Sequence, residues 1–304
     1  MGIKVSVCVV TYNQKEYLRE CLDSLIDQDL NCDYEIIVGD DASTDGTTDL
    51  VREYAKKFPD LIFPILHKKN LGPTKNYISV HSRAKGEYVC HMDGDDVAYP
   101  GKLQKQTNCL DGNKNYVLVW HKVNVFNDSG DVDKILHNRL NEIVDINAIT
   151  KIDILKYGML GAHSSTMYRR SAVPDFKLIK SEILDYFLIG LILDFGIACR
   201  IEEVLGGYRL NADKKTLSKN KSLYFNKSPI RKLYCGHLTW FFLQDERYRK
   251  PVFLNAVFNF LVDIRFLRPT AIDFLILSVK SFSFAGMLNI FVYYSEAMKL
   301  RGFL

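Results

Sequence analysis

The sequence has no large excess of charge of either sign. Its 304 residues include 40 Lys and Arg against 36 Asp and Glu, which gives a formal net charge of +4 at pH 7. A protein that wraps nucleic acid over its whole surface needs a much larger positive excess. We therefore expect no nucleic-acid partner for this chain.

Paired cysteines and a secretory signal are both missing. The cysteines are odd in number, scattered, and never form a C-x-x-C pair: Cys8, Cys21, Cys32, Cys90, Cys109, Cys199 and Cys235. This distribution favours neither a disulfide framework nor a structural zinc site. The N-terminus runs directly into an apolar segment, without the basic region and cleavage site of a signal peptide. These absences predict a protein of the reducing cytoplasm.

Long apolar runs are missing as well. No uninterrupted run approaches the roughly 20 residues that a membrane-spanning helix needs. Beyond Asn226, 11 Lys and Arg accompany many aromatic and aliphatic residues, against 5 Asp and Glu. Helices of this composition suit the surface of an anionic membrane, which predicts a peripheral protein on the inner face of the cell membrane. Packing against the rest of the chain, or against a second copy in a homodimer, is an equal alternative.

The first half of the sequence alternates short apolar runs with amphipathic stretches. The expected strands cover residues 5–10, 34–38, 61–66, 87–91 and 117–126, and the expected helices cover residues 14–27, 47–58, 73–84 and 102–110. Such a series predicts an α/β fold with a mostly parallel, Rossmann-like sheet flanked by helices. Ligands bind at the carboxyl ends of the strands in folds of this kind.

Two parts are expected along the chain, an α/β domain at 1–218 and a basic, aromatic-rich helical extension at 219–304. After a polar loop at 127–145, the α/β part continues with strands at 165–169 and 201–208 around a helix at 182–195. Residues 211–226 are rich in Lys, Ser and Asn, which is typical of a loop or linker. The extension is expected to contain long helices at 252–266 and 272–300.

Clustered carboxylates follow the second expected strand. Asp40, Asp41 and Asp45 lie among Ser and Thr residues just before a helix. Capping of that helix explains one or two of them. Alternatively, a paired carboxylate at a strand end accepts hydrogen bonds from a nucleotide base or ribose. Both interpretations remain open at this point.

A second acidic cluster follows the fourth strand. Asp93, Asp95 and Asp96 occupy four positions around Gly94, and three carboxylates so close repel one another unless a positive charge lies beside them. A divalent cation is the simplest such charge, and oxygen ligands without a Cys or His pair select Mg²⁺ or Mn²⁺. Gly94 allows a sharp turn that brings Asp93 and Asp95 together. A solvated acidic turn is the alternative.

These segments together resemble the family-2 inverting glycosyltransferases of the GT-A fold. The matching segments are Val-Thr-Tyr-Asn at 10–13, Asp-Asp-Ala-Ser-Thr-Asp at 40–45, Asn-Leu-Gly-Pro-Thr-Lys-Asn at 70–76 and Asp-Gly-Asp-Asp at 93–96. Two later segments are also similar to the family: Ile-Leu-Asp-Tyr-Phe-Leu at 183–188 and Glu-Val-Leu-Gly-Gly-Tyr-Arg at 203–209. Beyond about residue 219 there is no resemblance.

The resemblance implies roles for individual residues. It makes Asp185 the catalytic base, and Asp95 and Asp93 the ligands of Mn²⁺ or Mg²⁺. For the contact to uracil, Asp41 is the first candidate and Asp40 the second. The full donor-binding set that it implies is Thr11, Tyr12, Asn13, Asp40, Asp41, Asn70, Lys75, Asp93, Gly94 and Asp96. The cation would neutralise charge on the departing diphosphate. The structural alternative for Asp185 is that its negative charge stabilises the N-terminus of a helix through the helix dipole.

Two positions depart from the family pattern. Leu184 stands where many relatives have Glu before the base, so that a second carboxylate is missing unless Glu182 replaces it. Asn211 stands where the family's Tyr-Arg-x-His segment has His, and it lacks the charge and the ligand strength of imidazole. The candidates to supply charge to the diphosphate instead are Lys214, Lys215 and Lys219.

The expected function is therefore sugar transfer by a hexosyl- or N-acetylhexosaminyltransferase. The donor would be a UDP-sugar, and the acceptor a glycan or polyprenyl-linked hydroxyl in O-antigen or capsule synthesis. A catalytically silent sugar-binding or scaffold subunit is the first alternative. A sugar nucleotidyltransferase is the second, although the segment after the first strand lacks a Gly-rich basic phosphate loop. A dinucleotide dehydrogenase lacks its Gly-x-Gly-x-x-Gly signature here.

Overall fold

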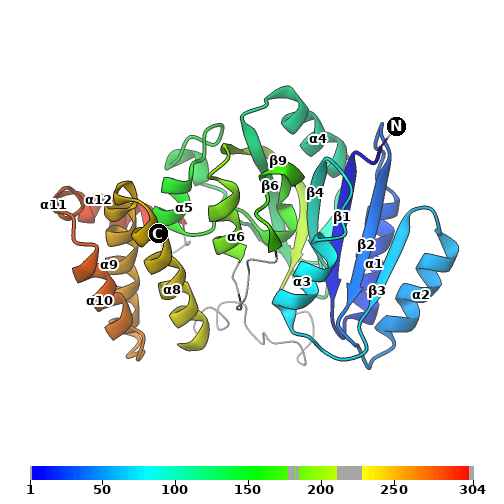
Figure 1. Ribbon diagram of the computed structural model, residues 1–304, viewed down its shortest axis with the longest axis horizontal. Helices are drawn as coiled ribbons and strands as arrows, with labels where there is room; N and C mark the ends of the chain where they lie inside the picture. Colours follow the sequence, from blue (N-terminus) through cyan, green and yellow to red (C-terminus); the bar gives the residue numbers. More distant parts are fainter. Residues whose placement is uncertain (1, 177–181, 183–184, 211–227, 301–304) are drawn as a thin grey trace. The chain divides into compact units, whose positions relative to one another are not determined.

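A mixed β-sheet lies at the centre of the α/β part (Figure 1). The computed structural model describes residues 2–176, 182, 185–210 and 228–300. Within these residues nine strands form one sheet in the order β3-β2-β1-β4-β8-β6-β9-β5, with β7 beside β6. The segment at 211–226, expected to be a loop or linker, lies outside the described residues.

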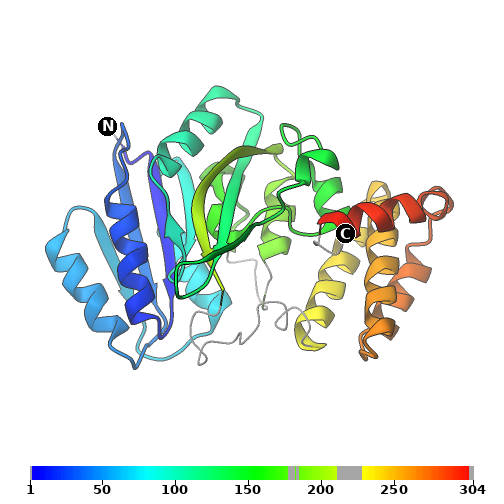
Figure 2. The ribbon, with the colours of Figure 1, turned by 180° about the vertical axis from the view of Figure 1, so that it is seen from behind.

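The first half of the sheet is parallel. It consists of β1 (Val5–Thr11), β2 (Tyr34–Asp40), β3 (Ile62–Leu66) and β4 (Tyr88–Asp93). The helices that connect or follow these strands are α1 (Lys15–Ile26), α2 (Thr47–Lys57), α3 (Pro73–His81) and α4 (Lys102–Gly112). Because α1 and α2 cover one face and α3 the other, the central strands are buried on both sides (Figures 1 and 2). This explains their continuous apolar sequences.

The second half of the sheet is mixed in direction. It consists of β5 (Val97–Ala98), β6 (Tyr116–Phe126), β7 (Val132–Ile135), β8 (Met167–Arg169) and β9 (Ile197–Arg209). The strand β8 is antiparallel to both β4 and β6, whereas β9 is parallel to β6. The sheet is thus less parallel than expected, because apolar patterning reports that a strand is buried and not in which direction it runs.

The chain divides into two compact units. The first comprises residues 1–136, 161–182 and 191–219, and the second comprises residues 137–160, 183–190 and 220–304. The helices of the second unit are α5 (Lys151–Tyr157), most of α6 (Asp185–Ile192), α8 (Ser228–Gln244), α9 (Arg249–Arg265), α10 (Ala271–Lys280), α11 (Phe284–Leu288) and α12 (Ile290–Leu300). Two segments from the middle of the chain therefore pack with the C-terminal helices.

Two expectations about local structure are wrong. The single helix expected at 272–300 is three helices, since Ser281 bonds back to the Leu277 carbonyl and Ser283 caps α11 through the Gly286 N–H. The loop expected at 127–145 contains β7 and a 3-10 turn. The unpredicted helix α5 did carry a sequence signal, because Thr150 and Asp153 form a capping box.

Candidate active site

The carboxyl ends of β1, β2 and β4 bring three predicted site residues into one row. Thr11 at the end of β1 is paired with Asp40 on β2, and Val10 is paired with Asp93 on β4. Because the three strands are parallel neighbours, everything that follows them lies at the same edge of the sheet. The convergence expected from the sequence is therefore present for the segments at 10–13, 40–45 and 93–96.

The loop after β1 is locked to the loop after β2. Asn13 has a left-handed backbone, with φ of 52°, which Asn adopts more readily than most residues. Its N–H donates to Ser43 Oγ at 2.8 Å, and its Oδ1 accepts from the Thr44 N–H at 2.8 Å. Tyr12 is exposed beside it. Asn13 thus shapes the rim of the site through its backbone and side chain.

Asp40 and Asp41 have different surroundings. Asp40 is fully buried and accepts hydrogen bonds from Ser43 Oγ and from Thr48 Oγ1. It stabilises the turn before α2 through these hydroxyl groups, whereas α2 begins after Gly46 without a side-chain cap. Asp41 is 3% exposed and its carboxylate accepts the Leu71 N–H at 2.7 Å and the Gly72 N–H at 3.0 Å. Asp41 therefore positions the segment that contains Asn70, and its oxygens retain lone pairs for one further donor.

The segment at 70–76 lies beside these carboxylates with mixed exposure. Asn70 is exposed, and its Oδ1 accepts the Gly72 N–H at 3.1 Å. Lys75 is exposed in the first turn of α3. Both side chains are accessible to a ligand at this edge of the sheet.

Gly94 is required by a close approach between β1 and the turn after β4. A Cβ atom at this position would lie 2.9 Å from both Cβ and Oγ1 of Thr11. The Gly94 N–H donates to the Val10 carbonyl at 2.9 Å, which holds the turn against β1. Besides the sharp turn expected from the sequence, the close contact with Thr11 is therefore a second, steric reason for glycine at this position.

Buried cations lie beside the acidic cluster. Asp96 is fully buried and accepts hydrogen bonds from Ser164 Oγ at 2.6 Å and from the Arg209 N–H at 2.9 Å. Arg209 Nε donates to the carbonyl oxygen of Asp95 at 3.0 Å, and the buried Lys102 Nζ donates to the carbonyl oxygen of Ser164 at 2.7 Å. Positive charge is thus present at this turn, and the Arg209 guanidinium also pairs with Glu20 and with Asp128.

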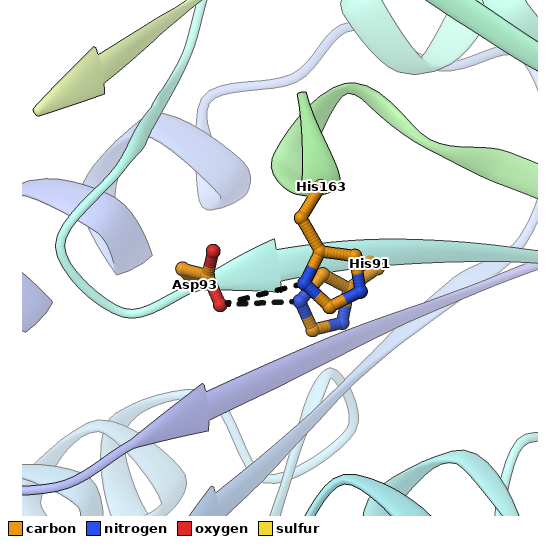
Figure 3. Close-up of side chains that lie close together, drawn as sticks. All are labelled: His91, Asp93 and His163. Atoms are coloured by element: carbon orange, nitrogen blue, oxygen red, sulfur yellow. Dashed lines mark hydrogen bonds and ion pairs between the residues drawn. The ribbon is translucent and has the colours of Figure 1, made fainter. Parts of the chain in front are cut away.

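Asp93 lies next to two histidines. Among the described residues, one group of three potential ligand side chains is close enough to share a cation: His91, Asp93 and His163, whose ligand atoms all lie within 4.8 Å of one another (Figure 3). The Asp93 Oδ1 atom is 3.3 Å from His91 Nε2 and 3.8 Å from His163 Nδ1. Asp93 keeps a 31% exposed side chain, so that a ligand can reach it. The buried Asp95, which was expected as a ligand, is not a member of this group.

The two histidines were not expected as site residues. His91 and Asp93 are two positions apart on β4, and side chains at this spacing point to the same face of a strand. That spacing was a usable signal. His163 comes from a 3-10 turn before β8, and its approach to Asp93 depends on a strand pairing that local patterns do not report.

Asp185 is the first residue of α6 and is exposed. It belongs to the second unit, whereas the other predicted site residues belong to the first. Leu184, Asn211, Lys214, Lys215 and Lys219 lie outside the described residues. The catalytic role of Asp185 thus stays a prediction from the family resemblance.

Comparison with known sequences identifies the family. Residues 6–176, more than half of the chain, match the family described as Glycosyl transferase family 2, and the chain belongs to this family. A protein of Mycobacterium tuberculosis is 40% identical over 130 residues, which cover 42% of this chain and 38% of that protein. EpsE of Bacillus subtilis, which is named a glycosyltransferase, is 31% identical over 180 residues, 59% of this chain and 61% of EpsE. TuaG of Bacillus subtilis, which is named a teichuronic acid biosynthesis glycosyltransferase, is 26% identical over 253 residues, 79% of this chain and 93% of TuaG. The chain spans less than half the length of the mycobacterial relative.

Solved structures share the fold. TarS 1–349 from S. aureus in complex with UDP-GlcNAc has a TM-score of 0.58 and 18% identity, and the match covers 99% of this chain and 92% of that one. The mannosyltransferase PcManGT from Pyrobaculum calidifontis in complex with GDP-Man and Mn²⁺ has a TM-score of 0.57 and 18% identity, with 99% and 82% covered. At this identity the likeness establishes the fold, and the GT-A prediction is confirmed.

Proposed function

We propose that this protein is a metal-dependent inverting glycosyltransferase. It transfers a sugar from a nucleotide-diphospho-sugar of the UDP-sugar type to a hydroxyl of a glycan or polyprenyl-linked acceptor in surface polysaccharide synthesis. The observation that carries the proposal is the row formed by Thr11, Asp40 and Asp93 at the carboxyl edge of three parallel strands, which is where nucleotides bind in such folds. The names of the relatives EpsE and TuaG and the UDP-GlcNAc bound to TarS support the choice of donor and pathway.

The donor set divides into base, sugar and phosphate contacts. Asp41 is the candidate to accept a base N–H, because its buried carboxylate is already held in place by two backbone N–H groups. Asp93 and Asp95 are the proposed ligands of a divalent cation such as Mn²⁺ or Mg²⁺, which prefers carboxylate oxygens; of the two, Asp93 belongs to the group that is close enough to share a cation. When bound, the cation supplies positive charge that stabilises the diphosphate as the glycosidic bond breaks. Asn70 and Lys75 are the exposed polar groups beside this edge.

Asp185 is proposed as the base of the reaction. Its carboxylate takes the proton of the acceptor hydroxyl, whose oxygen forms the new bond to the anomeric carbon of the donor sugar. The bond from that carbon to the diphosphate breaks on the opposite face, and its electron pair leaves with the nucleoside diphosphate. Attack opposite to the leaving group inverts the configuration, as in inverting glycoside hydrolysis. An α-linked donor therefore yields a β-linked product.

Donor binding is the direct test. Calorimetric titration with a panel of nucleotide sugars is expected to give binding of UDP-sugars that requires Mn²⁺ or Mg²⁺ and is lost in EDTA. We expect Asp41→Asn to weaken this binding about 10- to 150-fold, because the loss of one charge-assisted hydrogen bond costs about 1.5–3 kcal/mol. Asp49→Asn, a change at an exposed carboxylate on α2, serves as the matched control. Asp41→Asn binding as tightly as the wild type contradicts the base contact.

The same panel separates the alternatives. A silent binding subunit gives donor binding with neither transfer nor slow donor hydrolysis. A nucleotidyltransferase forms UDP-sugar and pyrophosphate from UTP and a sugar 1-phosphate. Either result contradicts the proposed transferase activity.

The second unit carries a surface of exposed apolar side chains, which we name the apolar surface. Most exposed large apolar side chains of the described residues belong to it: Leu261, Ile264, Phe266, Leu267, Ile272, Leu275, Ile276, Val279, Phe282, Phe284, Met287, Leu288, Phe291, Val292 and Tyr294. On α10, Ile272, Ile276 and Val279 form one exposed helical face, while Phe274 and Leu277 are buried on the other. This helix therefore has two apolar faces, one that packs against the rest of the unit and one that is exposed.

The charge beside the apolar surface favours an anionic membrane as its partner. Arg265 and Lys280 are exposed, whereas Asp273 is half-buried. Asp263 is fully buried, and Glu296 accepts hydrogen bonds from other residues of the unit. The accessible charge is thus mainly positive, which attracts acidic lipid headgroups and opposes a second copy of the same surface. None of the described helices is long and apolar enough to cross a membrane.

Vesicle binding tests the membrane interaction. The full chain is expected to sediment with vesicles of phosphatidylglycerol and phosphatidylcholine, and less with phosphatidylcholine alone. Leu267→Glu and Phe291→Glu, at side chains that are 91% and 86% exposed, are each expected to reduce the bound fraction at least tenfold, because a charge is costly to place among lipid chains. Val132→Glu, at an exposed apolar position of the first unit, is the control. Equal binding by all variants, or a stable dimer that Leu267→Glu dissociates, contradicts the proposal.

A further inference from the structure

A chain of hydrogen bonds leads from the sheet interior to Asp93. The Tyr168 hydroxyl is 2.5 Å from His81 Nδ1, His81 Nε2 is 2.9 Å from His91 Nδ1, and His91 Nε2 is 3.3 Å from Asp93 Oδ1. Tyr168, His81 and His91 are buried, and they come from β8, α3 and β4. Nothing in the expected donor set accounts for this arrangement.

The hydrogen bonds from Tyr168 to Asp93 can all run in the same direction, from donor to acceptor. An ionised Asp93 only accepts, so the hydrogen between it and His91 is on His91 Nε2. With its hydrogen on Nε2, His91 can accept at Nδ1 from His81 Nε2, and His81 Nδ1 can then accept from the Tyr168 hydroxyl. Burial raises the pKa of Tyr168 well above its usual range and lowers the pKa of His81 well below its usual range. Both groups therefore stay neutral, as a one-way chain of donors requires.

Ring stacking fixes the same side chains laterally. The rings of Tyr77 and His81 stack at 3.6 Å between centroids, and those of His91 and His163 also stack at 3.6 Å. A third stack joins Tyr77 to His163 at 5.6 Å. Each imidazole is thus held by neighbours on its face as well as by its ring nitrogens, which restricts the rotation of the Asp93 carboxylate that His91 contacts.

The separation between His163 and Asp93 fits two ligands of one cation. The Nδ1–Oδ1 distance of 3.8 Å is too long for a hydrogen bond. Two ligand atoms that each lie about 2.1 Å from the same ion are about 3.0 Å apart at adjacent and about 4.2 Å apart at opposite positions of an octahedron, so the observed 3.8 Å requires a small rotation of the two side chains. His163 lies beside Asp93 at the edge of the sheet, and its side chain is partly exposed (Figure 3). A cation between the two groups thus needs no rearrangement of the backbone.

We propose that Asp93 and His163 bind the divalent cation together, and that Tyr168, His81 and His91 are positioning residues that hold Asp93 for it. The inference deepens the proposed function and rests on it for the role of the cation in transfer. An imidazole ligand makes the site prefer Mn²⁺ over Mg²⁺, because nitrogen ligands suit Mn²⁺ better than the hard, oxygen-seeking Mg²⁺.

Cation binding without any donor sugar is the test. The full chain is titrated with Mn²⁺ and followed by electron paramagnetic resonance, and Mg²⁺ affinity is obtained by competition. We expect His163→Ala to weaken Mn²⁺ binding at least tenfold and Mg²⁺ binding much less. His91→Phe, which keeps a stacked ring but removes the donor, is expected to weaken both cations 10- to 100-fold, as is usual for residues that orient metal ligands. His91→Gln, whose amide can donate to Asp93, should recover most of that loss.

The cation-binding test has a control variant and separate outcomes that would overturn each part of the inference. His237→Gln removes an imidazole from the second unit and should leave both affinities unchanged, and thermal melting without cation verifies that each variant is folded. Unchanged Mn²⁺ affinity in His163→Ala overturns the ligand assignment. Equal weakening in His91→Phe and His91→Gln overturns the positioning role. A wild-type chain that binds cation and UDP-sugar, but whose cation affinity is the same in His163→Ala, overturns this inference alone. A chain that binds cation but no nucleotide sugar, or UDP-sugar without any cation, contradicts the proposed function.

Discussion

Asp185→Asn is expected to lower the rate of sugar transfer by about 10²- to 10⁴-fold while the affinity for UDP-sugar stays within about twofold of the wild type. The substitution keeps the size of the side chain and removes its capacity to take a proton. The acceptor hydroxyl must then attack without a base, whereas the proposed contacts to the nucleotide follow β1, β2 and β4 and are untouched. Initial transfer rates and calorimetric donor binding, measured on the same preparations, separate the two effects.

The chain offers matched controls for this variant. Asp194 is exposed just beyond the end of α6, so Asp194→Asn makes the same change near the other terminus of the helix. Glu182→Gln tests whether Glu182 replaces the carboxylate missing at position 184. We expect near wild-type transfer from Asp194→Asn and a loss of less than tenfold from Glu182→Gln. Full transfer by Asp185→Asn would exclude it as the base and point to Glu182 or another carboxylate.

The parallel half of the fold was predictable because its elements have strong periodicity. Strands β1, β2 and β4 are buried on both faces, and their apolar runs are long enough to be distinguished from the helices between them. The strand β5 has two residues, too few for any period to show, whereas β8 lies within the strand predicted at 165–169. Their places depend on pairing with β9 and β4, which are distant in sequence.

The acidic motifs of the site were predictable, and their partners were not. Asp93, Asp95 and Asp96 were recognised from a local pattern, and repulsion among them correctly required a positive charge nearby. Two residues that the motif does not contain, Lys102 and Arg209, supply part of that charge, and Arg209 arrives from β9. A local pattern reports which groups need a counter-charge, but only tertiary structure identifies the residues that provide it.

The alternatives left open for Asp40 and Asp41 also need the structure. Both residues follow β2, and the sequence does not distinguish them. The Asp40 carboxylate accepts hydrogen bonds from hydroxyl groups of the turn and the helix that follow it. The Asp41 carboxylate accepts a hydrogen bond from the backbone of a loop 30 residues later. A structural role in the turn before α2 therefore explains Asp40, and Asp41 is left as the better candidate for contact with a ligand.

Removal of a buried carboxylate is expected to have the largest effect on stability. Asp263 on α9 is fully buried, and its Oδ1 is 2.7 Å from Nε of Arg231 on α8, which is 3% exposed. It also accepts hydrogen bonds from Arg268 at 3.1 Å and from Thr270 Oγ1 at 2.6 Å. Asp263→Ala leaves the Arg231 guanidinium buried without this carboxylate, which costs about 3–5 kcal/mol of unfolding free energy. Urea denaturation followed by circular dichroism measures the loss.

The charge itself, rather than the volume of the side chain, is expected to cause this loss. A double variant, Arg231→Met with Asp263→Leu, removes both charges and keeps apolar volume, so it should recover most of the stability that Asp263→Ala loses. Asp273→Ala, at a half-buried position on α10, should change stability by less than about 1 kcal/mol. Because the pair joins α8 to α9 and Thr270 precedes α10, the helices that carry the apolar surface depend on it. Vesicle binding should therefore fall in Asp263→Ala and return in the double variant. Loss of binding in both variants would contradict this. It would mean that the charged pair itself contributes to the membrane contact, and not the packing that the pair supports.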